Sequence, residues 1–316
     1  MRRLLAIAVS AAILGVIYWR IDLAGLGRSL ADAHYGWVII AVLALIPALA
    51  LTAWRLSLIA GLLAPLSVAE AGRLVLLAHS LNMILPSRLG DFIKAHAMAV
   101  PGTVPGREAL SIVVIEKTWD ALAVMAWCAV GLLIVERAAL DVRWAAFMIV
   151  AVTAFGLLIV ASRRFAVVVF TILRTAAPHR WRDAVADMAH VWFRAVDAFW
   201  RDRPRAALVI GITVLTWFLH LVEIWLFVVA IGVHVPFAAH LGLAPLVMAA
   251  SLVPLTLSGI GTRDAAIIVL YSPFMDAPTG AALGLLVILR YLVPALVGIP
   301  FTARYLEQIR LAGKRD

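Results

Sequence analysis

The chain is poor in charge and in cysteine. Charged residues make up 14% of its 316 residues, and Cys128 is its one cysteine. A single cysteine excludes an internal disulfide framework and a cysteine-based metal site. A hydrophobic fraction of 65% and a mean hydropathy of +1.04 exclude an ordinary soluble domain. The sequence predicts an all-α polytopic membrane protein, with residues 1–316 forming one membrane domain.

Positive charge exceeds negative charge, and almost all of it is arginine. The chain has 27 basic and 18 acidic residues, a formal net charge of +9, and its lysines are Lys94, Lys117 and Lys314. The basic residues lie between apolar runs and form no separate domain, so we do not expect nucleic acid as a partner. Loops that contact anionic lipid and set the topology account for this charge.

Apolar runs of membrane-spanning length recur along the chain. A crossing helix needs about 20 residues, and six runs reach or approach that length: Leu4–Trp19, Trp37–Trp54, Ala109–Val135, Trp144–Ala161, Ala206–Val233 and Thr279–Phe301. Two further apolar stretches, 68–100 and 238–275, are interrupted by Pro, Gly and charged residues. We therefore expect six full transmembrane helices and two re-entrant or broken helical hairpins.

The distribution of Lys and Arg predicts the orientation in the membrane. If the N-terminus is cytoplasmic and only the six runs cross, 20 basic residues fall on the cytoplasmic side and five fall outside. Such an excess follows the positive-inside rule. The sequence therefore predicts that both termini are cytoplasmic.

The longest polar segment, residues 162–205, is predicted to lie on the cytoplasmic membrane surface. It carries nine Arg and four Asp. Apolar side chains recur in it at steps of three and four residues, namely Trp181, Val185, Met188, Trp192, Val196 and Phe199. This spacing is typical of an interfacial amphipathic helix, which serves either as a connector or in regulation.

The two halves of the chain resemble each other. The run that starts at Ala109 can be laid over the run that starts at Ala282, and a similar offset relates two upstream spans. Residues 1–143 and 144–316 then form half-repeats with three crossings and one broken segment each. Because three is odd, the second half is inverted. Paired discontinuous helices in inverted repeats are typical of transporters with a substrate site at the midplane.

Charged side chains gather in the first broken segment and early in the span that follows it. Three recur at three-residue steps, and three more lie within about one turn of the next helix. Burying one such charge at a helix centre costs about 2.5–3.5 kcal/mol. We therefore expect ion pairs between the two segments, contact with a polar lipid headgroup, or both. The candidate residues are Asn82, Arg88, Asp91, Lys94, Glu116, Lys117 and Asp120.

The second broken segment has a glycine-rich turn before two charges. Gly259 and Gly261 allow a sharp backbone turn, with N–H groups free to face an anion, and Arg263 and Asp264 follow. A nucleotide-binding loop is not predicted, because no strand precedes the turn and the glycine fingerprint is incomplete. We interpret it as the tip of a broken helix.

Further polar residues lie in the middle of predicted spans. Arg290 and Tyr291 occupy the last one, and Asp264 or Glu223 is expected to pair with the arginine. His220 and Glu223 are i,i+3 neighbours that form either a structural pair or a proton relay. One His and one Glu are too few for a metal site, and no nucleophile–base–orienter arrangement is recognisable. We expect no metal, no cofactor and no catalysis.

Three segments form an ordered pattern that covers nearly the whole chain. Asn82–Asp91 contains Asn, Pro and Ser-Arg-Leu-Gly-Asp; Glu116–Asp120 reads Glu-Lys-Thr-Trp-Asp; and Pro254–Asp264 ends in Ser-Gly-Ile-Gly-Thr-Arg-Asp. Together they resemble the membrane region of the lysylphosphatidylglycerol synthase/flippase family. Its motifs are Asn, Pro and Ser-Arg-Leu-Gly-acidic, then Glu-Arg-x-x-Asp, then Pro followed by Gly-Gly-x-Gly-x-Arg-Glu.

The chain departs from the family pattern at three positions. Lys117 stands where Arg is usual, Ser258 replaces the first Gly of the glycine run, and Asp264 replaces Glu. None of these changes removes a charge, so the polar site is expected to persist. Because the chain ends soon after the last predicted span, the resemblance implies the translocating half of the family and not the synthase.

The resemblance and the paired broken helices favour a flippase in the bacterial cytoplasmic (inner) membrane. It would move a phospholipid or lipid-linked amphiphile between leaflets, with basic residues receiving an anionic headgroup and acidic residues balancing charge. Three alternatives stay open: an ion-coupled small-solute transporter, a membrane enzyme acting on lipid headgroups, and a non-transporting membrane partner of another enzyme. Membrane lipids are the expected partners, and a homo-oligomer or a partner lipid-modifying enzyme is compatible with the sequence.

Overall fold

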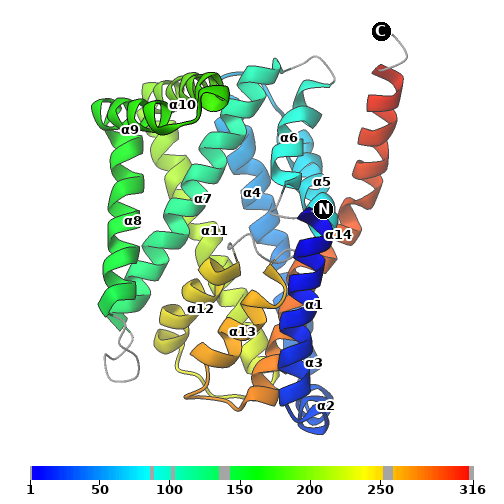
Figure 1. Ribbon diagram of the computed structural model, residues 1–316. Helices are drawn as coiled ribbons and strands as arrows, with labels where there is room; N and C mark the ends of the chain where they lie inside the picture. Colours follow the sequence, from blue (N-terminus) through cyan, green and yellow to red (C-terminus); the bar gives the residue numbers. More distant parts are fainter. Residues whose placement is uncertain (1, 86–88, 101–103, 135–142, 252–258, 313–316) are drawn as a thin grey trace.

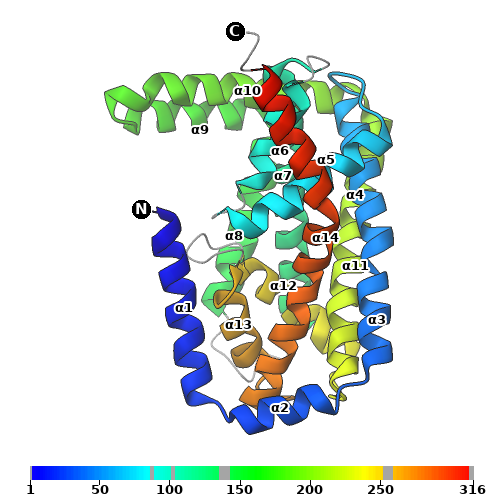
Figure 2. The same cartoon turned by 90° about the vertical axis from the view of Figure 1, so that its right-hand side faces the viewer.

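The computed structural model describes residues 2–85, 89–100, 104–134, 143–251 and 259–312, and every element in these ranges is a helix. Figure 1 shows an upright bundle with α9 (Arg163–Ala176) and α10 (Arg182–Arg201) lying across one end. At the other end α2 (Leu23–Ala31) lies across the bundle (Figure 2). We call these the α10 end and the α2 end. The predicted all-helical fold is confirmed for the described residues.

Three described helical segments are long and apolar enough to cross a membrane. They are α3 (Tyr35–Leu43) with α4 (Leu45–Ala60), α11 (Arg203–Ala230), and most of α14 (Ala277–Ala312). A fourth crossing results if α8 (Arg143–Ala161) and α9 are counted together, although the two helices are bent by 108° relative to each other. These spans fit a polytopic membrane protein.

The remaining predicted crossings also fall in helices. Leu4–Trp19 lies in α1 (Arg2–Arg20), and Ala109–Val135 corresponds to α7 (Gly106–Ile134), since Val135 lies outside the described residues. Figure 2 shows α1 running from the middle height of the bundle to the α2 end. α7 has 29 residues, but its first half carries several charges. The number of full crossings therefore stays a prediction.

Each stretch predicted to be re-entrant forms a pair of short helices. α5 (Val68–Ile84) and α6 (Gly90–Ala99) lie toward the α10 end, whereas α12 (Phe237–Ser251) and α13 (Thr262–Leu270) lie toward the α2 end (Figures 1 and 2). The breaks fall within the predicted ranges 68–100 and 238–275. The two hairpins thus enter the bundle from opposite ends.

Glycines allow each hairpin to pack closely against the last helix of the other half. α5 packs along α14, where a Cβ on Gly298 would lie 2.1 Å from the carbonyl oxygen of Leu76. α12 packs along α7, where a Cβ on Gly131 would lie 2.5 Å from the carbonyl oxygen of Gly242. Such separations are possible only without a side chain. The first hairpin is therefore packed tightly on α14 and the second on α7.

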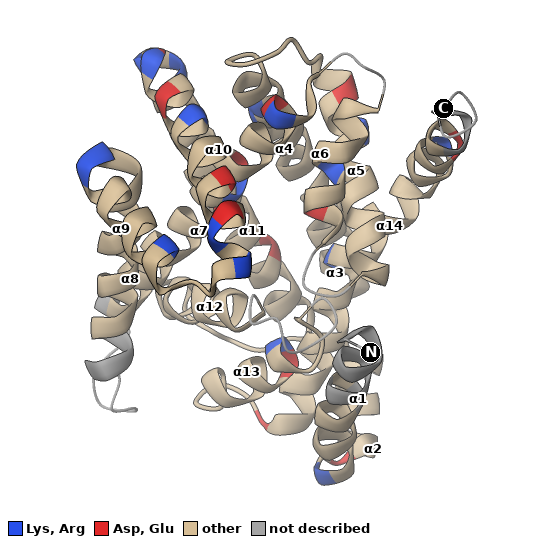
Figure 3. Ribbon diagram, turned by 45° about the horizontal axis from the view of Figure 1, so that its top comes forward, with Lys and Arg blue, Asp and Glu red and all other residues tan. Residues whose placement is uncertain are grey.

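The polar segment 162–205 forms two helices instead of one continuous amphipathic helix. The Ser162 hydroxyl caps α9, and a short 3-10 turn, His179–Trp181, precedes α10. Arg163 joins the two helices by an ion pair with Asp197, at 2.5 Å between Nη1 and Oδ2. Figure 3 shows basic and acidic segments along α9 and α10 at this end of the bundle. The connection breaks at residues 177–181 because Pro178 removes a backbone donor.

The apolar interior consists of two clusters, one toward each end of the bundle. The first is built mainly from α4 to α7, with α10 and the start of α11, and the second mainly from α3, the end of α11, and α12 to α14. Three long helical segments contribute to both clusters: α3 with α4, α11, and α14. These segments also carry polar side chains among their apolar ones, namely Arg55 in α4, Thr216 in α11 and Arg290 in α14, and these side chains line the candidate site.

We expect Gly298→Ala to lower the stability of the detergent-solubilised protein by about 1–3 kcal/mol, because overpacking forces α5 and α14 apart. Gly211→Ala is the matched control, since a Cβ on Gly211 of α11 meets no atom within 4 Å. That control should keep or slightly raise stability, as alanine has the higher helix propensity. Thermal unfolding followed by tryptophan fluorescence measures both. Equal stability of the two variants would contradict the close packing of α5 on α14.

Candidate functional site: a charged cavity between the two apolar clusters

A cavity of about 140 Å³ lies where the two apolar clusters meet. Its walls come from α4, α5, α6, α7, α11, α12 and α14, and they include both charged and apolar side chains. The charged ones are Arg55, Asp91, Lys94, Glu116, Lys117, Asp120 and Arg290. Four cations and three carboxylates therefore line one partly open cavity near the middle of the long helices.

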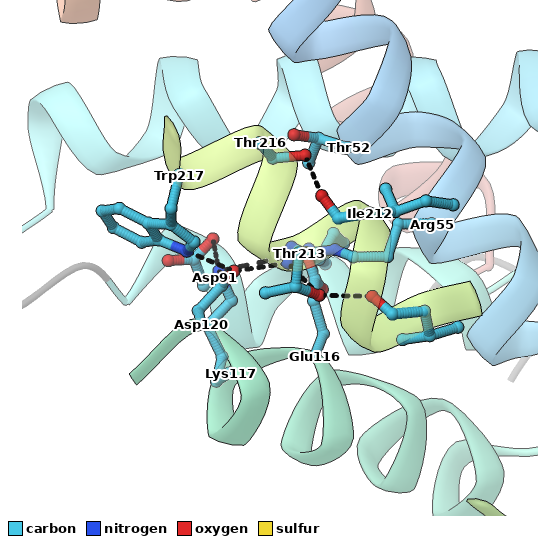
Figure 4. Close-up of polar contacts among 12 residues, drawn as sticks. Thr52, Arg55, Asp91, Glu116, Lys117, Asp120, Ile212, Thr213, Thr216 and Trp217 are labelled. Carbon is cyan, nitrogen blue, oxygen red and sulfur yellow. Dashed lines mark hydrogen bonds and ion pairs between the residues drawn. The ribbon is translucent and has the colours of Figure 1, made fainter. Parts of the chain in front are cut away.

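Arg55 of α4 joins the carboxylates of α7. Its Nη1 donates to Asp120 Oδ1 at 2.6 Å and to Thr213 Oγ1 at 3.2 Å. Its Nη2 lies 3.6 Å from Glu116 Oε1, and the indole N–H of Trp217 donates to the same oxygen of Asp120 at 3.2 Å. Figure 4 shows these side chains converging from α4, α7 and α11. Arg55 is 1% exposed, so the pairing compensates a charge that is removed from water.

Two lysines complete the network and connect α6 to α7. Lys94 Nζ donates to Glu116 Oε2, and both side chains are buried. Lys117 Nζ lies 3.0 Å from Asp120 Oδ2 and 3.4 Å from Asp91 Oδ1. The ion pairs predicted between the broken segment and the next helix are thus present. Three cations and three carboxylates form one connected group.

Helix geometry explains how α7 presents its charges in two directions. Glu116 and Asp120 are i,i+4 neighbours and share a face, which Arg55 covers. Lys117 lies about 100° around the helix from Glu116 and faces Asp91 of α6. Gly90 lets α6 start against α5, since a Cβ there would lie 2.7 Å from the carbonyl oxygen of Ala78. The first turn of α6 therefore carries Asp91 to the network.

The opposite wall of the cavity carries Arg290 and Tyr291 of α14 and His220 of α11. Arg290 Nη1 lies 3.7 Å from Glu223 Oε2 and donates to the His220 carbonyl oxygen at 3.4 Å. His220 Nδ1 lies 3.3 Å from the same Glu223 oxygen. Of the two partners expected for Arg290, the structure selects Glu223. The arginine also lies over the Tyr291 ring, 5.7 Å from its centroid.

The glycine turn of the second hairpin forms a separate buried pair beside the cavity. Gly259 and Gly261 have φ values of 76° and 96°, as the predicted sharp turn requires. The expectation that their N–H groups are free to face an anion is wrong for Gly261, whose N–H donates to Asp264 Oδ2 at 2.8 Å. Arg263 Nη2 donates to Asp264 Oδ1 at 2.7 Å and to the Gly284 carbonyl at 3.0 Å. Neither side chain lines the cavity.

The second hairpin nevertheless reaches the cavity. Met248 and Ser251 near the end of α12 contribute to its wall, and so does Asn82 near the end of α5. Arg88, which was predicted to be part of the site, lies outside the described residues. The hypothesis that both broken segments meet at one polar site therefore holds for α5, α6 and α12, while the charges of α13 lie apart.

Arg55 is the central residue that sequence reasoning misplaced. It directly follows the apolar run that ends at Trp54, so it is one of the 20 basic residues that the count of Lys and Arg places on the cytoplasmic side. The structure buries it in α4 because the span continues to Ala60. Arg263, one of the five that the same count places outside, is also buried. A polar stripe offered a signal, because Thr52 and Arg55 are i,i+3 neighbours on α4. Both line the cavity with Thr216 and Trp217 of α11, and Arg55 contacts Thr213 of α11 directly (Figure 4).

Metal binding has no support in the described part of the chain. There, no group of three or more His, Cys, Asp or Glu side chains is arranged to hold an ion. The carboxylates of the cavity each have basic partners instead.

A comparison with known families gives a match over residues 3–298, to the family described as the lysylphosphatidylglycerol synthase TM region. The chain belongs to this family. The match includes both hairpins and every helix that lines the cavity, so the resemblance drawn from the three motifs is confirmed. The comparison with curated proteins gives no match. Membership in this family connects the chain to membrane and lipid function.

We expect Lys94→Met to destabilise the protein by about 3–5 kcal/mol, because it leaves Glu116 with less compensation in a buried position. The double variant Lys94→Met, Glu116→Gln should regain much of this loss, since no excess charge remains. Thermal or denaturant unfolding in detergent measures the cycle.

An exposed pair on the same hairpin provides the control. Arg73 and Glu70 of α5 lie 2.9 Å apart with side chains nearly half exposed, so Arg73→Met should change stability by at most about 1 kcal/mol. If Lys94→Met were as mild as Arg73→Met, or if the double variant were less stable than the single one, the described network would be wrong.

Proposed function

We propose that the protein moves a phospholipid or lipid-linked amphiphile between the two leaflets of a membrane. It acts as a transporter without covalent chemistry, in the bacterial cytoplasmic membrane. Family membership supports the connection with lipid, and the charged cavity supports the location of the headgroup. The cavity lies among helices of membrane-spanning length, where charges are costly and mark a substrate path.

The observation that carries this proposal is the combination of a charged cavity with an exposed apolar rim. Asn82, Met83 and Asp91 line the cavity at the tip of the first hairpin. Beside them Ile84 is 50% exposed and Phe92 is 51% exposed. A headgroup in the cavity would thus leave its acyl chains against apolar side chains. Exposed apolar side chains also cover the other membrane-spanning helices, so the choice between a lipid and a small solute is made by the transport measurement.

The charge balance of the cavity favours an anionic group on the lipid. Its lining has one more cation than carboxylates. Lys117 is the first cation that a headgroup meets, since its side chain is 33% exposed whereas those of Arg55 and Lys94 are 2% exposed. A phosphate oxygen would take the position that Asp91 or Asp120 holds at Lys117 Nζ. The carboxylates then remain available to an ammonium or hydroxyl group.

Inverted repeats give the cavity access from both sides. Helices α1 to α7 and α8 to α14 would be the two halves, related by a pseudo-twofold axis in the membrane plane. The proposal is supported by the hairpins, which enter from opposite ends, and by the reciprocal packing of α5 on α14 and α12 on α7. The arginine-rich α10 end would be cytoplasmic. Arg55, Lys94 and Arg263 are buried and do not belong to loops. Without them, the excess of Lys and Arg on the predicted cytoplasmic side remains.

We expect Lys117→Met to slow lipid exchange by roughly 10- to 100-fold, since a charge-assisted contact to the headgroup is worth about 1.5–3 kcal/mol. The measurement is transbilayer movement of labelled phospholipids, across a panel of headgroups, in vesicles that contain the purified protein. Arg73→Met is the control, because Arg73 lies on the exposed side of α5 and not at the cavity.

Two outcomes would overturn the proposal. If the unchanged protein accelerates the movement of no lipid in the panel, a flippase is excluded for those headgroups. If uptake of a soluble solute is accelerated while lipid movement is not, the small-solute transporter replaces it. Chemical analysis of the recovered lipids tests the enzyme alternative, since a flippase returns every headgroup unaltered.

A further inference from the structure

A buried carboxylate behind the cavity wall is only half satisfied. Glu223 of α11 is 1% exposed, and its Oε1 has no hydrogen-bond partner. Its Oε2 lies 3.3 Å from His220 Nδ1 and 3.7 Å from Arg290 Nη1. An ionised carboxylate with an unpartnered oxygen in such a position is costly, whereas a protonated one loses most of that cost. Glu223 is thus placed where its charge can change.

His220 separates this carboxylate from the cavity. His220 and Arg290 line the cavity, but Glu223 does not. The imidazole can take a proton from water in the cavity and pass one from Nδ1 to Glu223 Oε2, so the ring ends in the protonation state in which it began. Glu223 therefore has a path for protons but no direct access for the substrate.

Neighbouring elements present few other charges to this pair. Arg290 of α14 is the charged group that acts on Glu223, and His220 is also influenced by His79 of α5, Asp120 of α7 and Arg55 of α4. His240 of α12 faces the same part of α11, where it bonds the Leu221 carbonyl oxygen and the Tyr271 hydroxyl. The dominant electrostatic partner of Glu223 is therefore Arg290.

We propose that Glu223 is a proton-binding site that couples proton uptake to the binding of an anionic lipid headgroup through Arg290. This inference rests on the proposed lipid transport. When Glu223 is ionised, it offsets the one excess cation among the cavity residues. When Glu223 takes up a proton, Arg290 keeps its charge without that compensation and attracts the phosphate of the headgroup. The proton that bonds to Oε2 leaves His220 Nδ1, and a proton from water in the cavity bonds to Nε2, so the ring ends as the other neutral tautomer.

Thermodynamic linkage fixes the direction of the effect. Because protonated Glu223 favours the bound headgroup, the bound headgroup favours protonation of Glu223 by the same factor. Raising the pH ionises Glu223, whose negative charge then compensates the positive charge of Arg290 and weakens headgroup binding. With one proton involved, the affinity falls by at most about tenfold per pH unit. A proton gradient across the membrane would then drive net movement of the lipid.

The test is lipid exchange by the full-length protein in vesicles, measured over a series of pH values that are equal on both sides, with a labelled phosphodiester lipid as the probe. We expect the rate of the unchanged protein to fall as pH rises, by up to about tenfold per unit. Glu223→Gln mimics the protonated carboxylate and should transport at a rate that hardly depends on pH. Glu70→Gln, the same substitution at an exposed position, should keep the original pH profile.

A second measurement needs no variant. A soluble short-chain phosphodiester lipid added to the purified protein in weak buffer should cause uptake of up to one proton per chain, reported by a pH-sensitive dye. Release of protons, or no uptake at any pH in the series, would overturn the coupling, as would equal pH profiles for the unchanged protein and Glu223→Gln. Failure of the unchanged protein to move any lipid would instead overturn the transport function on which the coupling rests.

Discussion

A charge inside an apolar helix bundle requires a partner of opposite charge. Arg55 is that partner for two carboxylates of α7. Its guanidinium contacts both Asp120 and Glu116, while Lys94 and Lys117 take the remaining oxygens of those carboxylates. Removing one member would leave another buried and uncompensated, so α4, α6, α7 and α11 hold their relative positions together. The cavity exists because these side chains point at one another and keep the apolar clusters apart.

The charged side chains of this network differ in how far they are exposed to the cavity. Arg55, Lys94 and Glu116 are nearly inaccessible and serve as its framework, whereas Lys117 and Asp120 are partly open to it. The opposite wall places Arg290 between the cavity and a carboxylate behind it. The partly open side chains of the cavity are thus backed by buried ones that are held by their ion pairs.

Much of the fold followed from hydropathy and from the positions of Gly and Pro. The helices, the two breaks and the segment across the α10 end all lie close to the predicted ranges, since apolar length and backbone-breaking residues act locally. The pairing of Lys117 with Asp120 could also be predicted, because it depends only on helix periodicity. The partner of Arg290 could not be predicted. Glu223 and Asp264 are both acidic residues of other apolar segments, and only the packing of the helices distinguishes between them.

The sequence by itself determined that the chain is a helical membrane protein of its family. It also determined that charged side chains lie within apolar segments, where each one needs a partner from another helix or a polar ligand. Tertiary structure decided which charges share a cavity. Arg55 and Asp120 are 65 residues apart, and Arg290 and His220 are 70 residues apart, so no local pattern connects them. The glycines that let α5 approach α14 and α12 approach α7 likewise act between helices that are far apart in sequence. Such contacts depend on separations of a few ångströms between helices, which periodicity and composition do not encode.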